Sequence, residues 1–130
     1  MTNTPKLYKL AIIILILEGV IMRNYSAYPK ETLQSGMESH PCFMEDWSEF
    51  LEIKPYNPID VFVIYSCVED TLAVMDKPCL GIRPNSDLEK NLGMNETDKR
   101  VLHGRFPEPP TDRSGFMAVQ TMEELVDFLL

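Results

Sequence analysis

The stretch Val61–Tyr65 constrains the fold more than any other part of the sequence, because it reads Val-Phe-Val-Ile-Tyr without a polar residue. β-Branched and aromatic residues favour strands, and a continuous apolar run is typical of a central strand covered on both faces. Further strands are expected at Cys79–Ile82, Arg100–Phe106 and Phe116–Gln120. The sequence therefore predicts a small sheet.

The clearest helix signals are capping boxes, in which Ser, Thr or Asp begins a helix and Glu follows three residues later. The two side chains satisfy backbone N–H groups that have no partner in the first turn. The pattern occurs at Asp46–Glu49, Ser66–Glu69, Ser86–Glu89 and Thr121–Glu124. Gly93 is placed to end the third of these helices, and a weaker helix is expected from Pro29 to Ser35, closed by Gly36.

Together these elements predict an α+β or α/β fold, with a three- to four-stranded mixed sheet packed with four to five helices. The order of strands and helices after residue 60 allows a parallel crossover, and the sequence leaves the choice between the two classes open. Residues 22–130 are expected to form a single globular domain, because their number matches the usual size of one domain.

Residues 1–21 contain the apolar run Leu10–Leu17, which is followed by Glu18 and Gly19. The run is shorter than the roughly 20 apolar residues of a membrane span, and no small-residue cleavage site of a signal peptide follows it. Two interpretations remain. The run is a buried strand, or it is an annotation overrun in which Leu17–Gly19 is encoded by a ribosome-binding sequence and Met22 is the native start.

The chain carries 20 acidic residues against 12 basic ones, which gives a formal net charge of −8. An acidic surface repels the phosphate backbone, so direct binding to nucleic acid is not expected. The same surface suits a partner protein with a basic surface.

The three cysteines Cys42, Cys67 and Cys79 form no closely spaced pair. An odd number of cysteines without such pairing indicates a reducing compartment, here taken as the cytoplasm, instead of a disulfide framework. Neither C-x-x-C nor H-x-x-x-H spacing is present, and no cofactor fingerprint is found, so neither a metal nor a cofactor is expected.

Cys67 is the one residue that suggests covalent chemistry. If Ser66 caps a helix, Cys67 occupies its first position, where the helix dipole lowers the pKa of a thiol and activates it as a nucleophile. A base would have to come from His40 or His103, the only histidines of the chain. A small α/β enzyme with Cys67 at a strand-to-helix turn is therefore the alternative hypothesis.

The candidate partner-binding residues are Glu45, Trp47, Glu49 and Glu52. The three glutamates recur at i, i+4 and i+7, which places them on one side of a helix. An acidic helix edged by a tryptophan is a suitable binding surface for a basic protein. No set of residues assembles into a recognisable catalytic motif. The sequence thus favours a small, acidic, non-enzymatic protein-binding module of the immunity-protein, antitoxin or viral-inhibitor type.

Overall fold

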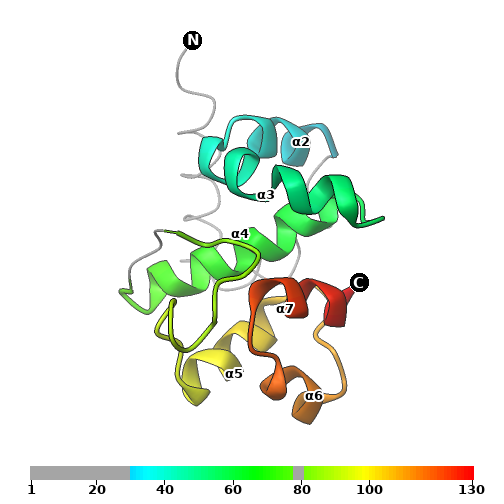
Figure 1. Cartoon of the computed structure of the whole chain (residues 1–130). Coiled ribbons are helices and arrows are strands. Elements are labelled where there is room, and N and C mark those ends of the chain that lie inside the picture. The colour runs from blue at the N-terminus through cyan, green and yellow to red at the C-terminus, as the bar shows by residue number, and fades with distance from the viewer. Residues whose placement is uncertain (1–29, 78–80) are drawn as a thin grey trace.

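The structure is a computed structural model that describes residues 30–77 and 81–130, and in these residues the chain is helical (Figure 1). The predicted mixed sheet is wrong, since the one β feature of the described residues is an isolated antiparallel bridge between Asp87 and Thr121. The predictions for residues 1–21, for Pro29 and for Cys79 lie outside the described residues. The helices are α2 (Lys30–Glu38), α3 (Pro41–Ile53), α4 (Pro58–Val74), α5 (Glu96–Arg105), α6 (Arg113–Ala118) and α7 (Met122–Leu129).

The apolar stretch Val61–Tyr65 lies inside helix α4, so its prediction as a strand is wrong. Asn57 caps this helix by accepting a hydrogen bond from the backbone N–H of Ile59 at 2.9 Å, and Pro58 occupies the first helical turn. Ten of the 17 residues of α4 are buried. A helix that is covered on several sides needs apolar residues on all of its faces, and its sequence therefore lacks the usual helical alternation.

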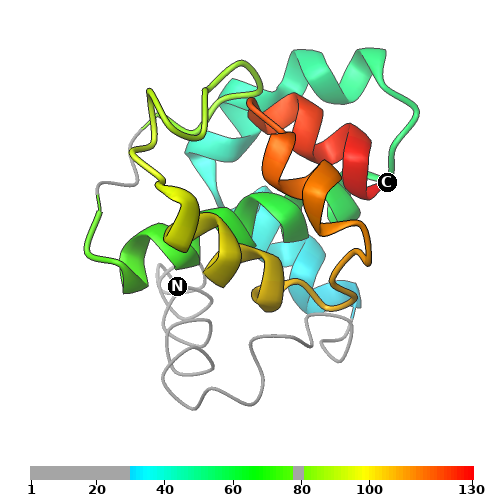
Figure 2. The same ribbon diagram turned by 90° about the horizontal axis from the view of Figure 1, so that it is seen from below.

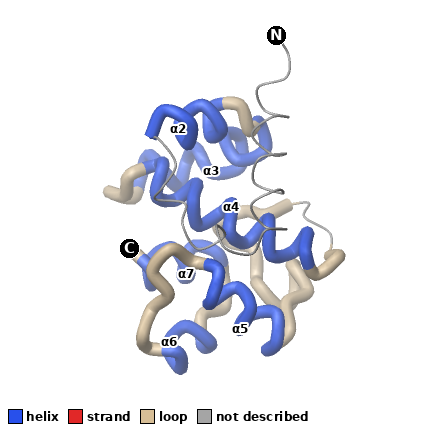
Figure 3. The backbone as a smooth tube through the Cα atoms, turned by 180° about the vertical axis from the view of Figure 1, so that it is seen from behind, coloured by secondary structure: helices blue, strands red, loops and turns tan. Residues whose placement is uncertain are grey.

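Helix α4 runs through the middle of the molecule between two groups of helices (Figures 1 and 3). Helices α2 and α3 lie on one side of it, and α5, α6 and α7 lie on the other. Helix α4 contacts α2 and α5 directly, while α2 contacts α3 and α5 contacts α6. Helices α6 and α7 lie side by side when the molecule is seen from below (Figure 2), and the rings of Phe116 and Phe128 join them at 6.3 Å.

Aromatic side chains fix the inner face of α3 to α4. The ring of Phe43 meets Phe62 and Tyr65 edge to face, with centroid distances of 5.1 and 5.0 Å. Trp47 and Phe50 continue this face of α3, with their rings 5.2 Å apart. Pairs of this geometry each add about 0.5–1.5 kcal/mol beyond the burial of apolar area, so they set how α3 lies against α4.

Residues 81–94, which precede α5, form turns that are held by side-chain hydrogen bonds to the backbone. Ser86 Oγ donates to the carbonyl of Gly81 and accepts from the N–H of Arg83, both at 2.8 Å. These turns replace the helix that was predicted to begin at Ser86–Glu89. Within the described part of Cys79–Ile82, residues 81 and 82 belong to no strand.

The buried side chain of Lys99 joins α5 to the end of α6. Its Nζ donates to the carbonyl oxygens of Val119 and Met117 at 3.3 and 3.4 Å, and it forms an ion pair with Glu89 at 3.1 Å. Carbonyl groups in the last turn of a helix have no partner within the helix. Lys99 supplies that partner and so holds the two helices together.

Besides the box at Ser86, the structure corrects two predicted capping boxes, and it confirms the fourth. Thr121 begins α7, where its hydroxyl accepts from the N–H of Glu124 at 3.3 Å and the Glu124 carboxylate accepts in return. Asp46 and Ser66 lie inside α3 and α4, so neither begins a helix. Helix α3 begins instead after His40, whose side chain caps its first turn.

Two predicted strands are also helical. The segment Arg100–Phe106 lies mostly within α5, and Phe116–Gln120 begins in α6. Helix α2 continues through Gly36, which was expected to end it, and closes at Glu38.

Candidate functional site

Trp47, which was predicted to anchor a partner, lies in the core. Its side chain is 0% exposed, and its Nε1 donates to the carbonyl oxygen of Ile82 at 2.9 Å. A partner could reach this ring only if α3 moved away from the turn that carries Ile82. Trp47 therefore contributes to the fold and is not part of an accessible surface.

Glu45, Glu49 and Glu52 are all exposed, on the side of α3 that faces away from the core. Their spacing places them on one face of the helix, opposite to the buried ring of Trp47. Within residues 30–77 and 81–130, none of the three carboxylates takes part in an ion pair. No basic side chain of the described part of the chain therefore neutralises their negative charge.

Ile53 lies at the end of the same helix and is 71% exposed, the highest value among the exposed large hydrophobic residues of the described chain. It follows Glu49 by four residues, so the two side chains are neighbours on the helix surface. We call the group formed by Glu45, Glu49, Glu52 and Ile53 the acidic α3 face. Ile53 is not among the residues predicted from sequence, although its spacing from Glu45 and Glu49 matches that face.

Comparison with protein-family models, with curated proteins and with solved structures gives no match to this chain. No helix of residues 30–77 and 81–130 combines the length and the apolar character needed to cross a membrane.

Cys67 lies in the middle of α4, so the predicted strand-to-helix turn does not exist. The thiol is fully buried, and burial raises its pKa well above the ordinary value; the charge of Asp70 raises it further, and that of Arg105 opposes the rise. The Sγ atom is 3.9 Å from the carbonyl oxygen of Arg105. A buried thiol that stays protonated is a poor nucleophile, so this position does not favour covalent catalysis.

Both histidines are engaged with partners other than Cys67. His40 Nε2 lies 3.2 Å from a carboxylate oxygen of Glu69, and His103 Nε2 lies 2.6 Å from the carbonyl oxygen of Pro110. In the described ranges no hydrogen bond joins either ring to Cys67, and no cluster of His, Cys, Asp and Glu is arranged to hold a metal ion. The alternative enzyme hypothesis has thus lost the arrangement on which it depended.

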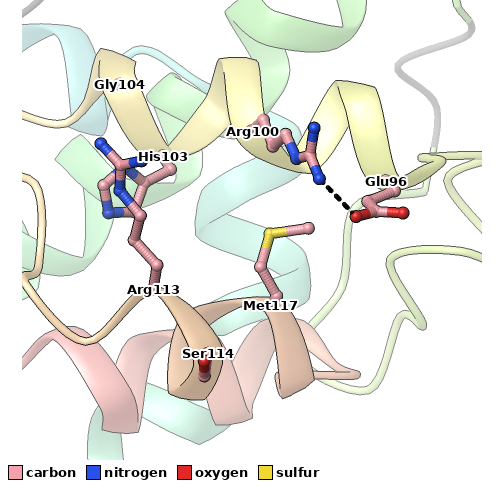
Figure 4. Close-up of a pocket in the computed structure, with 7 residues that line it drawn as sticks. All are labelled: Glu96, Arg100, His103, Gly104, Arg113, Ser114 and Met117. Atoms are coloured by element: carbon pink, nitrogen blue, oxygen red, sulfur yellow. Dashed lines mark hydrogen bonds and ion pairs between the residues drawn. The ribbon is translucent and has the colours of Figure 1, made fainter.

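Cavities in the described part of the molecule lie away from α3. One, of about 490 Å³, lies between α5 and α6, where Arg100, His103 and Arg113 contribute to its lining (Figure 4). Another, of about 360 Å³, is lined mainly by apolar side chains of α2, α4 and α7 and of the segment after α5. Neither is lined by residues of α3, so the acidic α3 face is separate from both of these cavities.

Proposed function

We propose that this protein is a non-enzymatic protein-binding module of the immunity-protein, antitoxin or viral-inhibitor type, and that its acidic α3 face docks on a basic partner protein. The observation that carries the proposal is the exposure of Glu45, Glu49 and Glu52 on one face of a well-packed helix, without an ion pair in the described chain. The proposal places the protein in the cytoplasm with its partner.

The negative charge of the acidic α3 face affects both the rate and the specificity of binding. Carboxylates at i and i+4 repel each other weakly, so a sequence selected for stability alone would favour a basic residue at one of these positions. A net charge of −8 steers a basic protein toward the molecule, and local complementarity then fixes its orientation.

Ile53 supports the proposal because charge alone gives little net affinity. Binding energy at protein interfaces is concentrated in a few apolar or aromatic contacts, surrounded by polar residues that exclude water. An isoleucine that is 71% exposed one helical turn after Glu49 has this arrangement. Ile53 takes the role of apolar anchor that was predicted for Trp47.

The test is quantitative affinity capture from the native host, followed by mass spectrometry. The double variant Glu49→Lys/Glu52→Lys reverses the charge of the face. A control, Glu108→Lys, adds a positive charge in an exposed segment between α5 and α6. Proteins that bind through the acidic face will be basic, will be retained by the wild type and the control, and will be lost from the double variant.

Salt gives the second readout. The Debye length falls from about 10 Å at 0.1 M to about 3 Å at 1 M ionic strength, so a complex held by exposed charges weakens steeply across this range. If the same proteins are captured equally by the wild type and the double variant, the acidic α3 face is not the binding surface and the proposal fails.

A further inference from the structure

Two arginines line the cavity between α5 and α6: Arg100, which pairs with Glu96 on α5, and Arg113 on α6 (Figure 4). Arg100 and His103 line it from α5, while Arg113 and Met117 line it from α6. In Figure 4 the side chain of Arg113 extends from the start of α6 toward α5. The volume of about 490 Å³ falls within the range of roughly 300–1,000 Å³ that is typical of small-molecule sites.

The charge of this lining is opposite to that of the whole chain. Arg100 and Arg113 carry two positive charges and Glu96 carries one negative charge, so the lining has one excess positive charge. The whole chain has a formal net charge of −8, and both values count histidine as uncharged. A concave surface with low-dielectric walls focuses the field of the charges that line it. The local reversal of sign indicates an anionic ligand.

Both guanidinium groups can still donate hydrogen bonds to a ligand. Arg100 donates from Nη2 to Glu96 at 2.7 Å, which uses one of the five N–H groups of its guanidinium and leaves the others for a ligand. Arg113 is exposed, and it takes part in no ion pair within the described chain. A ligand anion would therefore not have to displace an internal partner of Arg113.

The walls of the cavity are held in place by contacts behind it. His103 Nε2 bonds to the carbonyl oxygen of Pro110 at 2.6 Å, and its ring packs edge to face on Phe116 at 5.0 Å. Lys99 fixes the far end of α6 to α5 through Met117 and Val119. Walls that are ordered before binding lower the entropic cost of binding a ligand.

We propose that this cavity binds a small phosphomonoester, with Arg100 and Arg113 on its phosphate and Met117 against its organic part. A phosphomonoester carries about −1.5 to −2 charges at neutral pH, which suits two guanidinium groups better than a single carboxylate does. The cavity is larger than an inorganic phosphate ion requires, and the flexible thioether of Met117 offers an apolar contact of adaptable shape. This inference does not depend on the acidic α3 face.

Phenyl phosphate is the probe, because it joins a phosphate to a compact apolar group. Binding is measured by isothermal titration calorimetry and by the shift of the Met117 methyl resonance, with inorganic phosphate and phenylacetate as comparison ligands. We expect saturable binding of phenyl phosphate that is tighter than that of either comparison ligand. Arg113→Gln and Arg100→Gln should each weaken it by about tenfold or more, as expected for the loss of a charged hydrogen bond.

Arg83→Gln is the matched control, because Arg83 is a 64% exposed arginine outside the cavity whose Nε lies 3.8 Å from Asp46. It removes the same charge from the chain and should leave the affinity unchanged. All three replaced side chains are exposed, and circular dichroism will verify that the variants fold. Absence of saturable binding, equal affinity for phenylacetate or inorganic phosphate, or equal weakening by Arg83→Gln would each overturn the proposal.

Discussion

Trp47 is the only tryptophan of the chain, and its indole N–H joins α3 to the turn after α4 through the carbonyl oxygen of Ile82. The ring also stacks on Phe43, with centroids 5.9 Å apart, and meets Tyr65 edge to face at 6.1 Å. One side chain thus contributes both aromatic packing and the satisfaction of a buried carbonyl. Its emission reports directly on the integrity of this contact.

Replacing Trp47 separates these two contributions. Trp47→Phe keeps an aromatic ring and removes the hydrogen bond to Ile82, while Trp47→Ala also opens a cavity. We expect a loss of about 3–5 kcal/mol in the free energy of unfolding for Trp47→Ala and a clearly smaller loss for Trp47→Phe. Urea denaturation followed by circular dichroism gives both values. A change below about 1 kcal/mol for Trp47→Ala would contradict the buried position.

At the scale of the element, the two faces of α3 explain why part of the candidate site could be predicted. The periodicity of an α-helix is fixed, so Glu45, Glu49 and Glu52 had to share a face once that segment was assigned as helical. The identity of the buried face depends on what packs against it. Local spacing could not decide whether Trp47 faces solvent or Tyr65 of α4, because that contact is tertiary.

Helix α4 explains why the fold class was wrong. Val61–Tyr65 has the residue types of a strand, but the burial of α4 on several sides selects apolar residues without regard to helical phase. The residues just before Val61 indicate a helix. Asn57 is a suitable cap, Pro58 suits the first helical position, and Asp60 is an acidic residue in the first turn. The apolar composition of Val61–Tyr65 nevertheless favours a strand.

Helix α5 begins with a capping box that a search limited to Ser, Thr or Asp followed by Glu does not find. Asn95 Oδ1 accepts from the N–H of Asp98 at 2.8 Å, and the Asp98 carboxylate accepts from the N–H of Asn95 at 3.0 Å. Asn and Asp satisfy the same backbone groups as the more common pair. Including them would have replaced the predicted strand Arg100–Phe106 by a helix.

The contribution of this box can be measured at the level of the helix. Asn95→Ala removes the cap and should lower the free energy of unfolding by about 1 kcal/mol, whereas Asn95→Ser should retain most of it. Thr97→Ala, at an exposed position inside α5, is the control and should be neutral or slightly stabilising because alanine has the higher helix propensity. Urea unfolding followed by the emission of Trp47 compares the variants. Equal effects of Asn95→Ala and Thr97→Ala would show that the box contributes nothing.

At the scale of the whole molecule, α4 separates the two surfaces for which we propose binding. Helix α3 belongs to the group on one side of α4, and the cavity between α5 and α6 belongs to the other (Figure 1). The cavity could not be predicted from sequence, because it exists only where α5 and α6 meet, and Arg100 and Arg113 belong to different helices. Charge spacing along one helix is a local property, and the complementarity of two helices is not.

If the acidic α3 face is kept for binding, its residues should lower the free energy of unfolding relative to residues chosen for stability alone. Glu45 and Glu49 are like charges at i and i+4 on α3, in a chain of net charge −8 and without an ion pair in the described residues. Such a pair destabilises a helix by about 0.2–0.5 kcal/mol at low salt. Glu49→Gln should therefore raise the free energy of unfolding by a few tenths of a kcal/mol, and the gain should shrink as salt screens the repulsion.

Glu96→Gln is the opposite case, because Glu96 is paired with Arg100 at 2.7 Å on α5. Neutralising it removes an attraction and should lower stability by a similar small amount, and this effect should also shrink with salt. Both variants change the net charge by the same amount. The opposite signs of their effects on the free energy of unfolding therefore follow from the local surroundings of Glu49 and Glu96. Urea titrations at about 0.01 and 1 M ionic strength, where the Debye length changes from about 30 to 3 Å, measure both effects. If both variants stabilise the protein equally, the total charge controls stability, and the acidic α3 face has no local cost that binding would have to justify.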